Sequence, residues 1–161
     1  MMLRWLFGNR APPETQVEDD EEQGVEPPHV SRRVVDQRLR NRIMEILDML
    51  VDWETTIPSF GATGYFNWFF DFFPDHPPPY PNPALTDPER EAIGAVHLMM
   101  DQACDATSDD VSEAQLVASG WPQRIKPVAQ DALALMMQRG RFSEDTEEGK
   151  PSSMEPWPNG S

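Results

Sequence analysis

His97, Asp101, Cys104 and Asp105 are the residues of this chain whose types and spacing could do chemistry. On a helix, positions about three, four, seven and eight apart share one broad face, so all four could point the same way. A His and a Cys seven residues apart are still separated by about two turns, roughly 10 Å, and cannot share a hydrogen bond. A metal bound by His97 and Asp101 would need further ligands from elsewhere. We favour a satisfied, semi-buried histidine and a buried structural cysteine over a metal or nucleophile site.

No stretch of the sequence carries a recognised catalytic or cofactor-binding motif. There is no Gly-x-Ser-x-Gly elbow, no His-Glu-x-x-His pair and no dinucleotide fingerprint. Residues 59–64 are expected to form a turn-rich link. Within it, Gly61 and Gly64 form a Gly-x-x-Gly pair, but the Gly-Lys-Ser/Thr ending of a phosphate-binding loop does not follow. The sequence therefore predicts a protein that is not an enzyme and holds no cofactor or metal.

The composition is strongly acidic, with 28 Asp and Glu residues against 13 Lys and Arg and a formal net charge of −15. Nucleic acids and anionic lipids are bound through many Lys and Arg contacts, so neither is expected as a partner. A basic protein fits this charge. Arginine outnumbers lysine eleven to two, which is a habit of GC-rich genomes and suggests a bacterium or its phage.

Cys104 is the single cysteine, so no disulfide can form within the chain. No run approaches the ~18 apolar residues of a membrane-spanning helix. Residues 1–10 are hydrophobic and basic, but their apolar part is too short for a secretory signal. They are a candidate docking segment for a membrane or a partner, although a frayed terminus is the simpler interpretation. These features predict a cytoplasmic protein.

Composition divides the chain into one domain, residues 29–142, and two acidic arms, residues 1–28 and 143–161. The arms are rich in acidic residues and proline and poor in branched apolar residues. They cannot bury enough surface to offset the entropy of the chain, so we expect both arms to be disordered.

Residues 65–73 are the expected centre of the domain. Nine of the fifteen aromatic residues lie between Phe60 and Tyr80, and each buried aromatic side chain removes roughly 150–250 Å² from water. Aromatic residues favour strands, but no second convincing strand exists to pair with this one, so we expect a short helix. Such a helix is either covered on several sides or partly exposed for a partner. We favour the covered arrangement.

Apolar periodicity predicts the remaining elements. A long helix should begin after Ser31 and end at Pro58, with an apolar stripe at intervals of three or four: Val35, Leu39, Ile43, Ile46, Leu50, Trp53 and Ile57. A capping box of Thr86 with Glu89 should begin a second helix that ends by Thr107, with a buried stripe at Ile93, Val96, His97, Met100, Ala103 and Cys104. Shorter helices are expected over 108–118 and 127–139. The predicted fold class is all-α, a small bundle of four or five helices around the short aromatic helix.

Arginines crowd the first half of the long helix, where cations oppose the helix dipole. A solvated face that tolerates a small penalty is the simplest interpretation. The sharper hypothesis is that the acidic run Glu18 to Glu22 folds back onto these arginines.

The predicted function is a non-enzymatic binding module that occludes a basic protein partner, as an immunity protein, an antitoxin or another inhibitor does. Its binding face would combine carboxylates with an exposed part of the aromatic segment: Asp48, Asp52, Tyr65, Trp68, Asp71, Asp101, Asp105, Asp109 and Asp110. One alternative is an adaptor or scaffold that docks through residues 1–10, the proline-rich stretch 74–83 or Trp157. The other is a metal-binding or enzymatic protein that uses His97 and Asp101.

Overall fold

The computed structural model describes residues 30–73 and 82–148, and all the regular structure in these residues is helical. The helices are α1 (Arg32–Val51), α2 (Trp53–Phe70), α3 (Asp87–Asp105), α4 (Glu113–Ala118) and α5 (Trp121–Met137). The predicted all-α class and the number of helices are confirmed.

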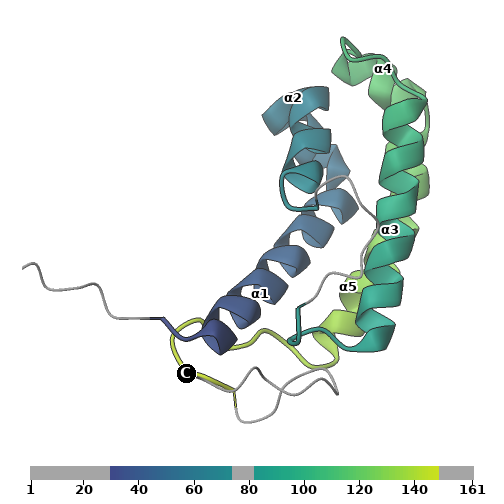
Figure 1. Cartoon of the computed structure of the whole chain (residues 1–161). Helices are drawn as coiled ribbons and strands as arrows, with labels where there is room; N and C mark the ends of the chain where they lie inside the picture. Colours follow the sequence, from purple (N-terminus) through teal and green to yellow (C-terminus); the bar gives the residue numbers. More distant parts are fainter. Residues whose placement is uncertain (1–29, 74–81, 149–161) are drawn as a thin grey trace, which may run out of the picture.

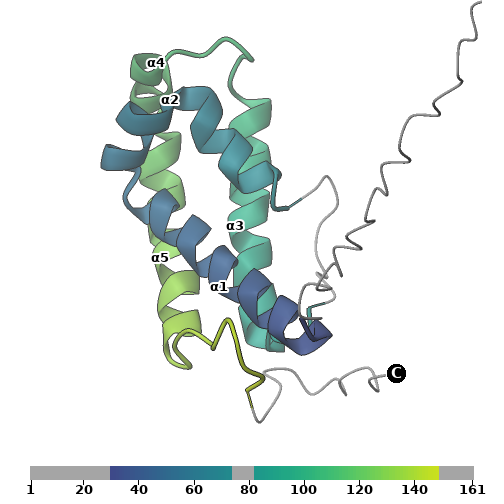
Figure 2. The ribbon, with the colours of Figure 1, turned by 90° about the vertical axis from the view of Figure 1, so that its left-hand side faces the viewer.

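The helices form two layers, with α1 and α2 on one side and α3 and α5 on the other (Figures 1 and 2). In the view of Figure 2, α1 crosses diagonally in front of α3 and α5, and α4 lies at the upper end. Buried residues from α1, α2, α3, α4 and α5 join in one hydrophobic core, as expected when amphipathic helices bury their apolar faces together.

The long first helix ends earlier than predicted. Ser31 caps it as expected, accepting a hydrogen bond from the Val34 amide. It stops at Asp52, where the backbone leaves helical geometry (φ −93°, ψ 44°). Pro58 lies inside α2 and does not end a helix, and the turn predicted after it is reduced to one residue, Gly61 (φ 77°, ψ 171°). Glycine adopts this left-handed φ without a steric penalty, so α2 bends sharply here.

The aromatic segment is helical, and it is both core and surface. Tyr65, Phe66, Phe69 and Phe73 are buried, while Trp68 is exposed. The rings of Phe69 and Phe73 lie 5.6 and 6.2 Å from that of His97 on α3. These large rings therefore fill the space between α2 and α3.

The other helix boundaries follow local chemistry that only partly matches the prediction. The capping box of Thr86 and Glu89 is present as predicted. Helix α4 begins five residues later than expected, after a second capping box formed by Ser112. Helix α5 begins at Trp121, six residues earlier than expected, because a proline at the second helical position is well tolerated.

The first half of α1 buries its polar side and leaves its apolar stripe open. Gln37, Arg40 and Asn41 are fully buried, whereas Val35 is 37 % exposed and Leu39 is half-buried. The predicted stripe holds from Ile43 onward. A buried polar group is costly unless it is hydrogen-bonded, so these three side chains require partners from elsewhere in the fold.

Residues 142–148 supply partners for two of them. The Gln37 amide donates to the carbonyl of Ser143 at 2.6 Å and accepts from the Glu148 amide at 2.8 Å. Asn41 exchanges two hydrogen bonds with the backbone of Phe142, at 2.8 and 3.0 Å. The chain therefore packs on α1 up to Glu148, six residues beyond the predicted end of the domain at residue 142.

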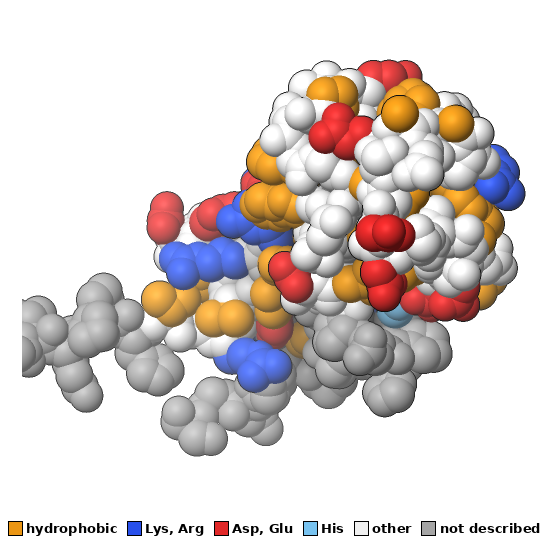
Figure 3. Space-filling view, turned by 90° about the horizontal axis from the view of Figure 1, so that it is seen from above, with side chains coloured by type: hydrophobic (Ala, Val, Ile, Leu, Met, Phe, Trp, Pro, Cys, Tyr) orange, Lys and Arg blue, Asp and Glu red, His pale blue; other side chains and the backbone are white. Residues whose placement is uncertain are grey.

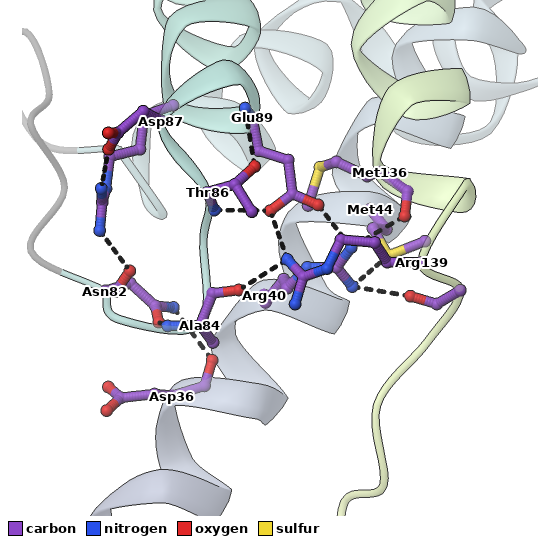
Figure 4. A network of polar contacts seen from close by, with 12 residues as sticks. Asp36, Arg40, Met44, Asn82, Ala84, Thr86, Asp87, Glu89, Met136 and Arg139 are labelled. Carbon is purple, nitrogen blue, oxygen red and sulfur yellow. Dashed lines mark hydrogen bonds and ion pairs between the residues drawn. The ribbon is translucent and has the colours of Figure 1, made fainter. Parts of the chain in front are cut away.

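Arg40 has its own partners, which join three helices (Figure 4). Its guanidinium donates to Glu89 on α3 at 2.8 Å, to the Met136 carbonyl on α5 at 2.8 Å and to the Gly140 carbonyl at 2.7 Å. Arg139 contacts the other Glu89 oxygen at 3.0 Å. Both guanidiniums lie over the ring of Phe142, at 4.6 and 4.8 Å from its centroid. This network, which the sequence analysis did not predict, ties α1, α3 and α5 to the chain beyond α5.

Replacing Gly61 with alanine should destabilise the protein by about 1–2 kcal/mol, because an L side chain adopts φ 77° only with strain. Gly94→Ala is the matched control, since a Cβ at this helical glycine meets nothing within 4 Å. It should stabilise the protein by up to about 1 kcal/mol. Urea denaturation of both variants measures the difference, and a Gly61→Ala protein as stable as the wild type would contradict the kink.

Candidate functional site

Two large aromatic side chains are exposed side by side on α2. Phe60 is 52 % exposed and Trp68 is 44 % exposed, with ring centroids 5.6 Å apart. They lie on opposite sides of the kink at Gly61, which brings them together. A Cβ at Gly64 would lie 2.8 Å from the Phe60 Cβ, so this pairing requires glycine at position 64. Exposed apolar clusters of this kind mark interaction surfaces.

Three of the predicted carboxylates gather at the end of α3. Asp101, Asp105 and Asp109 are exposed and surround Cys104. Partial burial raises the pKa of the Cys104 thiol, and the negative charges of these carboxylates raise it further. Cys104 is exposed, so the predicted buried structural cysteine is wrong.

These carboxylates lack basic partners. Within the described residues, Asp105 and Asp109 form no ion pair, and Asp101 contacts only His97, at 3.5 Å. Some carboxylates elsewhere are paired: Glu45 contacts Arg141, Glu54 contacts Lys126 and Glu89 contacts Arg40. The negative charge at the end of α3 is therefore not compensated locally.

A cavity of about 210 Å³ joins the carboxylates to α2. Its lining comes from α2 and from the end of α3 with the turn that follows: Thr63, Phe66, Asn67, Cys104, Thr107, Ser108, Asp109 and Val111. Asn67 precedes the exposed Trp68 and faces the same cavity as Asp109. The cavity is thus bordered by Asn67 of α2 and by Asp109 beyond α3. We use the name α2–α3 face for the exposed residues of α2 and the carboxylates at the end of α3 taken together: Phe60, Asn67, Trp68, Asp71, Asp101, Asp105 and Asp109.

Figure 3 looks down on the α4 end of the molecule. Acidic and apolar side chains are interspersed on this end, while Lys and Arg side chains gather mainly toward the side where α1 begins. Asp71, at the end of α2, is exposed like Trp68.

The structure places the other predicted contact residues elsewhere. Tyr65 is 1 % exposed, so it cannot meet a partner as predicted, and its burial raises its pKa well above the usual range. Asp48 lines a separate cavity between α1 and α5 with Leu133 and Met137. Asp52 lies at the junction of α1 and α2, and Asp110 accepts a hydrogen bond from Ser108.

Phe60 is the residue of this face that sequence reasoning missed. It precedes the aromatic run and was assigned to a turn-rich link, because a kinked helix around Gly61 was not anticipated. Its spacing of eight residues from Trp68 gave no signal, because such positions lie about 12 Å apart along a straight helix.

His97 and Asp101 do not form a metal site in the described part of the chain. His97 is buried among the rings of Phe69, Phe70 and Phe73, and its Nδ1 has no hydrogen-bond partner. Across residues 30–73 and 82–148, no group of three or more His, Cys, Asp or Glu side chains is arranged to hold a metal. The arrangement suits an aromatic cage around a histidine better than coordination chemistry.

Searches against protein-family models, curated proteins and solved structures give no match for this chain. None of the described helices is long and apolar enough to cross a membrane. The docking segments proposed for an adaptor, residues 1–10, the proline-rich stretch up to residue 81 and Trp157, lie outside the described residues.

The Cys104 thiol should react more slowly with a disulfide reagent at pH 8 than the thiol of a short cysteine peptide. The reason is its raised pKa, which leaves less of the reactive thiolate. Replacing Asp105 and Asp109 with asparagine removes negative charge, lowers this pKa and should accelerate the reaction. The control Asp48→Asn/Asp52→Asn should leave the rate unchanged. Equal rates in the two double variants would show that the carboxylates at the end of α3 do not raise the pKa of the Cys104 thiol.

Proposed function

We propose that this protein is a non-enzymatic binding module that occludes a basic protein partner with its α2–α3 face. The mode of action is that of an immunity protein, antitoxin or other inhibitor, in which bound surface alone blocks the partner. A cytoplasmic location is part of this proposal, because the single cysteine and the exposed thiol suit a reducing compartment.

The observation that carries the proposal is the exposed pair of Phe60 and Trp68 on α2, together with the carboxylates of Asp105 and Asp109, which form no ion pair with any described Lys or Arg. Aromatic side chains, Trp above all, supply most of the binding energy at protein interfaces. Uncompensated carboxylates attract a basic partner, speed its association and discriminate against acidic proteins. The proposed face combines both kinds of group.

Ion pairs elsewhere in the fold support this assignment, because they engage some of the other carboxylates internally. Glu89 is buried and bonded to Arg40 and Arg139, and Glu45 is paired with Arg42 and Arg141. Such carboxylates have little to offer a partner. Asp105 and Asp109 remain available.

Affinity capture from host lysate at low salt, with the full chain as bait, tests the proposal. One protein of high isoelectric point should be retained by the wild type and by the control Met137→Ser, which changes an apolar side chain that is 55 % exposed on α5. Phe60→Ser/Trp68→Ser should weaken this binding by about 30-fold, the effect of losing ~2 kcal/mol at a hot spot. Asp105→Asn/Asp109→Asn should weaken it most at low salt, where the carboxylate charges act over the longest range.

Two outcomes would refute the proposal. One is capture of the same proteins by all four baits. The other is that the protein lost with the aromatic pair is acidic.

A further inference from the structure

A second surface lies at the opposite end of the molecule, where α1 begins. Val35 and Leu39 of α1 and Phe72 beyond α2 line a groove of about 350 Å³. Its rim carries charges of both signs: Arg38, Arg42, Glu45 and Glu144. Figure 3 shows apolar side chains bordered by Lys and Arg on the side of the molecule where α1 begins.

The groove exists because the first half of α1 turns its polar side, and not its apolar stripe, toward the core. Gln37, Arg40 and Asn41 turn inward to meet Glu89 and the chain beyond α5. Val35 and Leu39, the first two residues of the stripe, consequently face outward. Apolar area left in water forgoes about 25 cal/mol per Å² of burial, so a covering segment would stabilise this surface.

The rim charges show what kind of segment fits. Arg38 already donates to the Glu144 carbonyl at 2.7 Å and lies 3.9 Å from the Asp145 carboxylate. Arg42 is paired with Glu45. A strongly acidic segment gains little from arginines that already have partners, which argues against the predicted docking of Glu18 to Glu22. An apolar segment with little charge fits better.

We propose that residues 2–7 of this chain, Met-Leu-Arg-Trp-Leu-Phe, occupy the groove. They bring five apolar side chains and a single charge, that of Arg4. The described chain begins at residue 30, beside the α1 N-cap, and Val35 and Leu39 follow within about 12 Å along the helix. A loose link of the length between Phe7 and Val30 spans about 25 Å. An intramolecular ligand on such a link has an effective concentration of about a millimolar.

This inference does not depend on the proposed function, because the groove and the α2–α3 face share no residue.

Paramagnetic broadening in the full-length protein tests the proposal. A nitroxide label is attached at Asn9→Cys in a Cys104→Ser background, and amide signals are compared before and after reduction of the label. The amides of Val35, Arg38, Leu39 and Arg42 should lose most of their intensity. Adding Leu3→Asp/Leu6→Asp to the spin-labelled protein, or Val35→Ser on the groove side, should restore the intensity of these amide signals. The control Leu98→Ser, far from the groove, should not.

Every other outcome overturns the proposal. Broadening that avoids the groove, or that persists in the Leu3→Asp/Leu6→Asp protein, would show that residues 2–7 are not the occupant. The last outcome is seen in a mixture of an isotope-labelled copy without the nitroxide and a spin-labelled copy without the isotope. If the spin-labelled copy broadens the groove signals of the other, the groove is a site of self-association instead.

Discussion

The buried guanidinium of Arg40 is the interaction on which the rest of the structure depends. Arg40 is 0 % exposed. In place of water, its guanidinium contacts the Glu89 carboxylate, two backbone carbonyls near the end of α5 and the Met44 sulfur. A buried ion pair adds little net stability over well-packed apolar residues, but removing one partner costs several kcal/mol. The network therefore specifies which helix faces meet: α1, α3 and α5 satisfy this charge only in the observed arrangement.

Two surfaces follow from this constraint. Turning the polar side of α1 inward brings residues 141–148 onto that helix and leaves Val35 and Leu39 facing a groove. The wide separation of α2 from α3 is filled by Phe69 and Phe73 around His97, so the opposite side of α2 remains in solvent with Phe60 and Trp68. At the first end Arg38 and Arg42 are paired, whereas at the second Asp105 and Asp109 form no ion pair with any residue that the structure describes.

The sequence predicted what local patterns determine. The all-α class, the capping of α1 by Ser31, the Thr86–Glu89 box and the buried positions Ile93, Val96 and Met100 all come from spacing and capping chemistry within a few residues. Arg40 could not be recognised as buried, because its partners lie 49 to 100 residues away in the chain. For the same reason the apolar Val35 was expected inside. Of the candidate site, the sequence predicted Trp68, Asp71 and the carboxylates on α3. Phe60 was missed because Pro58 was expected to end a helix, so the kinked helix that exposes Phe60 was not anticipated. Tyr65 was predicted on the exposed side of α2 but lies on its buried side.

A double-mutant cycle on Arg40→Met and Glu89→Gln tests the central role of this network most directly, because glutamine keeps an acceptor for the Thr86 amide. Urea denaturation of the wild type, both single variants and the double variant gives the coupling free energy. Each single variant should lose about 3–5 kcal/mol, since it leaves a buried group without its partner. The double variant should lose less than the sum of these losses by about 2 kcal/mol or more. Losses that add to within about 0.5 kcal/mol would show that Arg40 and Glu89 act independently and that the fold does not depend on their contact.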